Sequence, residues 1–172
     1  MLLSNYVKNQ NIISELSGED KDGVIKEMGN CLATIGDVTN KEELIDGMLK
    51  REEIESTAIG NGIAIPHTRG EFCKNLLVCI ARSKQGVDFN AIDGKPVFLI
   101  FMIAAPETAK KEYLQVIAKI ARFLKSENNK KNILYAETKD AILQVIGDFD
   151  ATFPGVEKVT TKDGRVIYKE MT

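Results

Sequence analysis

Two uninterrupted apolar runs decide the fold class of this chain: Leu76-Leu77-Val78-Cys79-Ile80-Ala81 and Val97-Phe98-Leu99-Ile100-Phe101-Met102-Ile103-Ala104-Ala105. A strand with one solvent-exposed face alternates apolar and polar residues, and neither run shows this alternation. We therefore expect two strands that are buried on both faces, in the centre of a sheet. Between them, Gln85-Gly86 and Asp93-Gly94 predict turns.

Helix signals precede the strand region. Ser17 with Asp20, and Thr39 with Glu42, form two capping boxes, and apolar residues at helical spacing follow each of them. The charged segment 50–53 is expected to end the second helix as a solvated tail. These signals predict two helices before the first apolar run.

Further helix signals follow the second apolar run. Thr108 begins a helical pattern, and shorter helices are expected at about 128–136 and 138–147. Helices on both sides of the strand region predict an α/β three-layer sandwich, with helices on both faces of a mixed central sheet. We assign this domain to residues 1–147.

Residues 148–172 are expected to form a C-terminal extension. Two β-type segments, 156–161 and 165–169, flank Asp163-Gly164, which is a strong signal for a hairpin turn. An isolated hairpin is only marginally stable in water, so this one should pack on the domain or pair with another chain.

The composition excludes several classes of function. The chain has 23 basic and 25 acidic residues, and this balance argues against a nucleic-acid-binding surface. No apolar run approaches the roughly 18 residues of a transmembrane helix, and the first residues lack the pattern of a signal peptide. The three cysteines contain no CxxC pair, which is typical of reduced thiols, so we expect a cytoplasmic protein without direct membrane insertion.

The only histidine, His67, follows the segment Gly60-Asn61-Gly62-Ile63-Ala64-Ile65-Pro66. Gly-Asn-Gly predicts a turn between two short strands, and Pro66 stiffens the backbone just before the histidine. We expect His67 to lie just past a strand. A neutral imidazole is nucleophilic at cellular pH and can carry a phosphoryl group. Arg51 and Arg69 are candidate hydrogen-bond donors to the phosphoryl oxygens.

The segment Arg51–Arg69 resembles the signature of the fructose/mannitol-type IIA domain of the phosphoenolpyruvate-dependent sugar phosphotransferase system. Three further segments are similar to sequence motifs found later in that family: Gly86-Val87-Asp88-Phe89, residues 91–97 and Ala105-Pro106-Glu107. The resemblance covers about residues 3–147. The nitrogen-regulatory branch of the family shares the same motif and fold.

This resemblance implies a phosphocarrier that is phosphorylated on Nε2 of His67 and uses Arg51 to clamp the phosphoryl group. The backbone near Gly62 and Thr68 is expected to supply further donors, and Asn61 occupies a position that is acidic in mannitol-type members. The implied partners are an HPr-like phosphate donor and a IIB domain or a regulatory target as acceptor. No metal or organic cofactor is expected, and the oligomeric state stays open.

One position departs from the family pattern. Many members carry a second active-site histidine after the Ala-Pro-Glu landmark, and Tyr113 stands at that position here. A tyrosine hydroxyl can donate a hydrogen bond, but with an ordinary pKa of about 10 it does not become charged near neutrality. The rate of onward transfer and its acceptor are therefore open.

Several alternatives stay open at the level of sequence. His67 phosphorylation could switch partner binding in a nitrogen-type regulatory protein, without sugar transport. The histidine and the three cysteines, Cys31, Cys73 and Cys79, could hold zinc, or Cys73 could act with His67 in a hydrolase. A degenerate structural module that takes up no phosphate is a further possibility.

Overall fold

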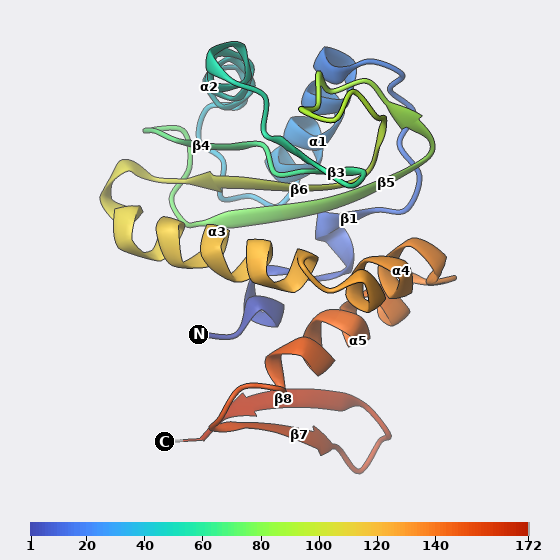
Figure 1. The fold of residues 1–172 in the computed structure, drawn as a ribbon. Coiled ribbons are helices and arrows are strands. Elements are labelled where there is room, and N and C mark those ends of the chain that lie inside the picture. The colour runs from blue at the N-terminus through green and yellow to red at the C-terminus, as the bar shows by residue number, and fades with distance from the viewer. Residues whose placement is uncertain (172) are drawn as a thin grey trace.

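The computed structural model describes residues 1–171 and contains one main sheet between two layers of helices (Figure 1). The helices are α1 (Lys21–Ala33), α2 (Lys41–Ile54), α3 (Lys110–Leu124), α4 (Glu127–Tyr135) and α5 (Lys139–Asp150). The strands are β1 (Ile12–Ile13), β2 (Ala58–Gly60), β3 (Ile63–Ala64), β4 (His67–Arg69), β5 (Leu77–Val87), β6 (Val97–Ala105), β7 (Val156–Thr160) and β8 (Val166–Glu170). Short 3₁₀ turns lie at Leu3–Tyr6, Asn9–Asn11 and Glu107–Ala109.

The main sheet is mixed, as predicted. Its strand order is β1-β5-β6-β3-β2, and β4 also pairs with β6. The β5–β6 and β2–β3 pairs are antiparallel, whereas β1 is parallel to β5, and both β3 and β4 are parallel to β6. Figure 1 shows α1 and α2 over one face of the sheet and α3, α4 and α5 on the other, which confirms the three-layer α/β sandwich.

Strand β6 explains why its sequence does not alternate. Leu99, Phe101 and Ile103 belong to the core cluster that contains side chains of α3, α4 and α5. Ile100 and Met102, which point to the other face, belong to the cluster that contains side chains of α1 and α2. Both faces of β6 are therefore covered by core side chains, and the prediction of a strand buried on both faces is confirmed.

Strands β3 and β4 pair one after the other with β6. Ile63 pairs with Leu99. Four residues later in each of the two segments, His67 pairs with Ile103. Between them the N–H of Ile65 donates to the carbonyl of Thr57 at 3.1 Å instead of to β6, and Pro66 has no N–H to donate. The break separates β4, a short strand that begins at His67, from β3.

One predicted turn is wrong. Gln85-Gly86 does not end a strand, because β5 continues to Val87 through an irregularity in its pairing with β6. Gly86 has a φ of +83°, which suits such a bulge because glycine tolerates positive φ. The other predicted turn is present: the N–H of Gly94 donates to the carbonyl of Ala91 at 2.9 Å.

The first two helices begin later than their sequence signals predict. The side chain of Asp20, and not that of Ser17, caps α1 by accepting from Gly23 N–H at 2.7 Å. Asn40, and not Thr39, caps α2 by accepting from Glu43 N–H at 3.1 Å. In each case a nearby residue could also serve as a cap, and the residue whose backbone turns from extended to helical takes the role.

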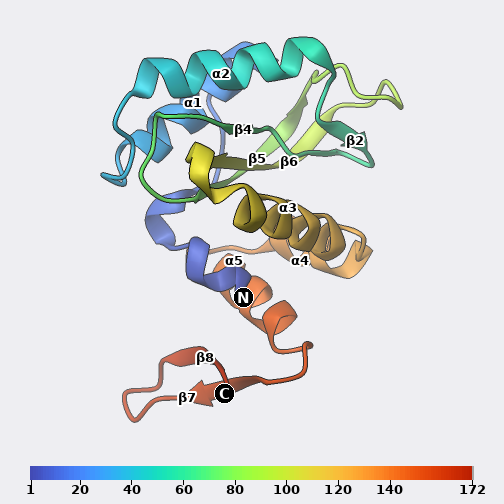
Figure 2. The same cartoon turned by 90° about the vertical axis from the view of Figure 1, so that its left-hand side faces the viewer.

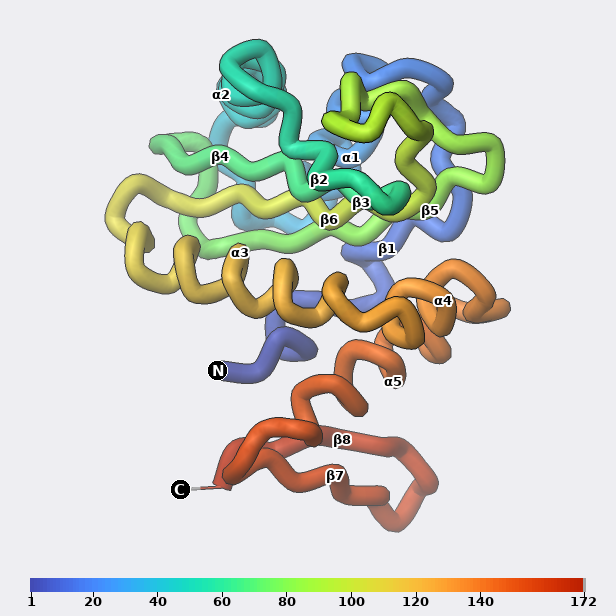
Figure 3. Tube along the Cα trace, in the orientation of Figure 1, coloured from blue at the N-terminus to red at the C-terminus, as the bar shows by residue number. Residues whose placement is uncertain are grey.

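The C-terminal hairpin predicted for the extension is present as β7 and β8, and it packs beneath α5 (Figure 3). Helix α5 itself runs past residue 147 to Asp150, whose buried carboxylate accepts N–H bonds from Leu3 and Ser4, each at 2.9 Å. The last helix is thereby tied to the start of the chain. The ring of Tyr168 on β8 covers Gly147.

Candidate active site

His67 is the first residue of β4, whereas the sequence placed it just past a strand. Its Nδ1 lies 2.6 Å from the carbonyl oxygen of Ile65, two residues earlier. A carbonyl oxygen only accepts, so Nδ1 carries the proton and donates it, and Nε2 keeps its lone pair. The ring therefore presents Nε2 as its nucleophilic atom.

The surroundings of His67 favour the neutral ring. Burial is the largest effect and lowers the pKa of His67 from 6.5, and the positive charge of Arg51 acts in the same direction. The hydrogen bond with Ile65 and the negative charge of Glu52 raise the pKa, but the net shift is downward. A lowered pKa leaves most of the imidazole unprotonated at neutral pH, which is the form that can attack phosphorus.

Tyr113 and Arg69 lie beside His67. Tyr113 projects from the first turns of α3, and its ring centroid lies 6.0 Å from that of His67. His67 and Arg69 are two residues apart on β4, so their side chains leave the same face of the strand. The guanidinium carbon of Arg69 lies 5.8 Å from the Tyr113 ring centre, and Arg69 Nε lies 3.5 Å from a carboxylate oxygen of Glu107.

Arg51 reaches the site from the other helix layer. It lies in the last turn of α2, where its Nη1 donates to the carbonyl of Glu55 at 2.8 Å. Its positive charge lowers the pKa of both His67 and Tyr113. Figure 2 shows β4, which begins at His67, between α2, which carries Arg51, and α3, which carries Tyr113.

Glu52 was predicted to be solvated, and this prediction is wrong. Only 6% of the residue is exposed. Its carboxylate lies 2.8 Å from Nζ of Lys21 and accepts from both N–H and Oγ of Thr57. A signal was available in the sequence: Leu44, Met48 and Glu52 are the buried residues of α2 and are spaced by four, so Glu52 continues the apolar stripe.

Of the remaining predicted site residues, Asn61 and Gly62 lie away from His67, whereas Thr68 is its neighbour in β4. Gly62 accepts N–H bonds from Phe98 and Leu99 near the start of β6, so Asn61 and Gly62 lie about 13 Å along that strand from the partner of His67. Asn61 is exposed at a φ of +56°. Thr68 is adjacent to His67, but its side chain leaves the opposite face of β4 and lies toward Gly47 of α2. The structure thus brings together His67, Arg51, Tyr113 and Arg69.

The cysteine-based alternatives receive no support from the geometry. Within residues 1–171, no group of three or more His, Cys, Asp or Glu side chains is arranged to hold a metal ion. Cys73 is buried, and burial together with the charge of Asp37 raises its pKa to about 11. A thiol with such a pKa stays protonated at neutral pH and is a poor nucleophile.

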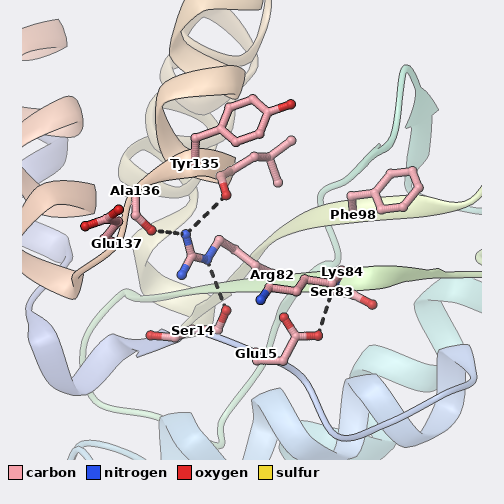
Figure 4. A pocket seen from close by; sticks show the side chains of 10 residues that line it. Ser14, Glu15, Arg82, Ser83, Lys84, Phe98, Tyr135, Ala136 and Glu137 are labelled. Atoms are coloured by element: carbon pink, nitrogen blue, oxygen red, sulfur yellow. Dashed lines mark hydrogen bonds between the residues drawn. The ribbon is translucent and has the colours of Figure 1, made fainter.

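A separate pocket lies beside the turn between α4 and α5 (Figure 4). Its central side chain, Arg82, donates from Nε to Ser14 and from Nη1 to the carbonyls of Ile133 and Ala136, at 2.7–3.0 Å. These bonds join β5 to the segment after β1 and to the end of α4. Arg82 therefore stabilises the fold here, and none of the predicted site residues lines this pocket.

Among the helices of residues 1–171, none has both the length and the apolar character needed to cross a bilayer. The fold and the site together define an α/β protein with one nucleophilic histidine at a sheet edge. Residues 5–148 match the family model described as "Phosphoenolpyruvate-dependent sugar phosphotransferase system, EIIA 2". The chain belongs to this family, and the resemblance drawn from its sequence is confirmed.

Relatives come from two branches of the family. The chain is 35% identical over 150 residues to the fructose-specific EIIABC component of Bacillus subtilis, covering 87% of this chain but only 24% of that longer protein. It is 32% identical to a nitrogen regulatory protein of Pseudomonas aeruginosa, covering 76% of this chain and 85% of the relative. The crystal structure of nitrogen regulatory protein IIA-Ntr from Neisseria meningitidis superposes with a TM-score of 0.78 at 26% identity, covering 84% of this chain and 98% of that one.

Proposed function

We propose that this chain is the phosphocarrier IIA component of a sugar phosphotransferase system of the fructose/mannitol type, and that His67 carries the phosphoryl group. The donor is a phosphorylated HPr-like protein, and the acceptor is a IIB domain. The observation that supports this most directly is the hydrogen bond from Nδ1 of His67 to Ile65, since it leaves the lone pair of Nε2 free. We place the reaction in the cytoplasm.

The reaction exchanges one phosphorus–nitrogen bond for another. The Nε2 lone pair of His67 attacks the phosphorus of the donor phosphohistidine, and the donor nitrogen leaves with its electron pair. In the second half, a nucleophile of the IIB domain attacks the phosphorus on Nε2, and His67 leaves as the neutral imidazole. Because the ring ends in its starting form, the carrier can accept phosphate again.

Two arginines are available to bind the phosphoryl oxygens. A phosphoryl group brings about two negative charges at neutral pH, and guanidinium groups bind phosphate with two parallel hydrogen bonds. Arg51 already influences the His67 ring, and Arg69 leaves the same face of β4. The contact between Arg69 and the half-exposed Glu107 is an open surface pair, so an arriving phosphate can replace it at small cost.

Apolar side chains flank the site and suit protein partners that bind in turn. Ile54, at the end of α2, is 81% exposed, and Leu114, next to Tyr113 on α3, is 53% exposed. Apolar side chains contribute most where they are buried at the centre of an interface. The donor and the acceptor would both cover this surface when they present their own reacting atom to Nε2.

Intact-mass spectrometry tests the proposal. The chain is incubated with phosphoenolpyruvate, enzyme I and HPr, and His67→Ala serves as the matched control. We expect an acid-labile gain of one phosphate that is absent from the folded variant. Absence of any gain with this donor and with a nitrogen-branch donor would overturn the proposal and favour a degenerate module.

The second candidate is a nitrogen-type regulatory protein, in which phosphorylation of His67 switches the binding of a partner. The similarity to nitrogen regulatory proteins favours it. The match covers 85% of the Pseudomonas aeruginosa protein and 98% of the Neisseria meningitidis chain. The phosphorylated chain is mixed with a fructose- or mannitol-type IIB domain. Rapid loss of phosphate to IIB supports the carrier, whereas retention of phosphate together with preference for the nitrogen-branch donor supports regulation.

A further inference from the structure

Glu52 lies where three segments meet: the end of α2, the start of α1 and the connection from α2 to β2. Its carboxylate contacts Lys21, the first residue of α1, at 2.8 Å and accepts Thr57 N–H at 3.1 Å. Both members of the ion pair are largely buried, with side-chain exposures of 15% for Lys21 and 3% for Glu52. A buried carboxylate with a cation and two further donors has a strongly defined position, since any shift leaves a buried charge unpaired.

A continuous series of hydrogen bonds leads from this carboxylate to the nucleophile. Thr57 donates to Glu52 through both its N–H and its hydroxyl. The carbonyl of the same Thr57 accepts from Ile65 N–H at 3.1 Å, and the carbonyl of Ile65 accepts from Nδ1 of His67 at 2.6 Å. The position of Glu52 therefore influences the carbonyl that selects the tautomer of His67.

Glu52 also holds the residue before it. Arg51 belongs to the last turn of α2, and beyond this turn the chain leaves for β2. The bonds from Glu52 to Thr57 close the connection between α2 and β2, and the pair with Lys21 joins the end of α2 to the start of α1. The backbone that carries Arg51 is thereby fixed relative to the sheet edge that carries His67.

We propose that Glu52 is the positioning residue of the phosphoryl-transfer site: it holds Arg51 at the end of α2 and, through Thr57 and Ile65, keeps His67 in the tautomer with a free Nε2. Glu52 makes no contact with the phosphoryl group in this role. The proposal rests on the proposed function, because positioning matters for transfer only if His67 is the acceptor.

Nitrogen NMR of the unphosphorylated protein provides the first test. His67 is the only histidine, so its two ring nitrogens can be assigned without ambiguity. We expect the wild-type ring to carry its proton on Nδ1, and Glu52→Gln to shift a measurable fraction to Nε2. Glu53→Gln is the matched control, since it removes the same charge from an exposed neighbour. A tautomer ratio in Glu52→Gln equal to that of Glu53→Gln would overturn the proposal.

The rate of phosphorylation by phosphorylated HPr provides the second test. We expect Glu52→Gln to be at least about tenfold slower than Glu53→Gln, because small displacements of reacting groups carry large rate penalties. If Glu52→Gln does not fold, the double variant Lys21→Met/Glu52→Gln removes both charges and should fold with the same two defects. A wild-type rate in the folded variant would overturn the proposal. Failure of the wild type to take up phosphate would instead contradict the proposed function, and the NMR result would still decide the positioning role.

Discussion

At the scale of single residues, His67 is controlled in two independent ways. Its tautomer is set by a hydrogen bond to a main-chain carbonyl, and its protonation state is set by burial and by the charge of Arg51. Both favour the same reactive form, a neutral ring with a free Nε2. The site therefore needs no general base to prepare its nucleophile.

This arrangement predicts a titration below the ordinary value. We expect the His67 ring signals to titrate with a midpoint under 6.5, and Arg51→Ala to move the midpoint upward, because loss of a nearby cation favours the imidazolium. The unfolded chain binds this proton at higher pH than the folded chain does, so the histidine's contribution to the free energy of unfolding falls as the pH drops below 6.5 and levels off under the folded pKa. A midpoint that Arg51→Ala lowers would contradict the placement of this arginine.

Tyr113 is predicted to assist transfer as a neutral donor. Burial raises its pKa above 10 despite the opposing charges of Arg51 and Arg69, so the hydroxyl keeps its proton throughout the physiological range. We expect Tyr113→Phe to slow phosphorylation about three- to tenfold, the equivalent of one ordinary hydrogen bond. Tyr135→Phe, at an exposed position, is the control. A loss as complete as that of His67→Ala would show that the tyrosine has a larger role.

At the scale of elements, the residues that cap α1 and α2 lie three residues and one residue later than the sequence predicted, and this difference can be measured. We expect Asp20→Ala and Asn40→Ala each to lower the free energy of unfolding by about 1 kcal/mol, because each side chain satisfies an N–H of the first turn. Ser17→Ala and Thr39→Ala test the caps that the sequence suggested, and each should cost less than about 0.5 kcal/mol. Urea unfolding measures all of them, and the reverse ranking would refute the assignment of the caps.

At the scale of the whole molecule, we infer that the C-terminal hairpin is an accessory to the domain that carries His67. The core cluster beside α3 includes Phe149 and contacts Phe153, and over the described residues it extends no further along the chain. The hairpin is held by Tyr168, whose ring lies over Gly147 and whose hydroxyl donates to Asp148 at 2.9 Å. Phosphorylation of His67 should therefore not depend on the hairpin.

Gly147→Ala tests this attachment. A β-carbon at Gly147 would lie 1.9 Å from the Tyr168 ring, so we expect the hairpin to be displaced and cleaved more readily by protease, while the rate of phosphorylation changes less than about twofold. In a Tyr168→Ala background the same substitution should instead stabilise α5 by up to about 1 kcal/mol, since alanine favours helix more than glycine does. Destabilisation in both backgrounds would show that another contact requires the glycine.

The sequence alone predicted the architecture, which the structure confirms, and it supplied His67 as the proposed nucleophile. Two apolar runs without alternation predicted central strands buried on both faces, and helix signals before and after them predicted the two covering layers. His67 was a candidate because it is the only histidine and follows a rigid Gly-Asn-Gly to Pro66 segment, and the resemblance of Arg51–Arg69 to the IIA signature made it the proposed phosphorylation site. The hairpin followed from Asp163-Gly164, because a tight turn is specified by its own residues. Such features can be predicted without tertiary information because their causes lie within a few residues.

Only the tertiary structure decided which side chains surround the nucleophile. Glu52 appeared solvated in its charged neighbourhood, and its burial depends on Lys21, 31 positions earlier in the chain. Strand β4 exists only through its pairing with Ile103–Ala105 of β6, and β1 only through its pairing with β5. Asn61 and Gly62 lie near His67 in sequence but are separated from it along β6. These features arise from contacts between distant segments, whose free energies are set by packing and by pairing of buried charges. The spacing of Leu44, Met48 and Glu52 signals which face of α2 is buried, but it does not identify Lys21 as the partner.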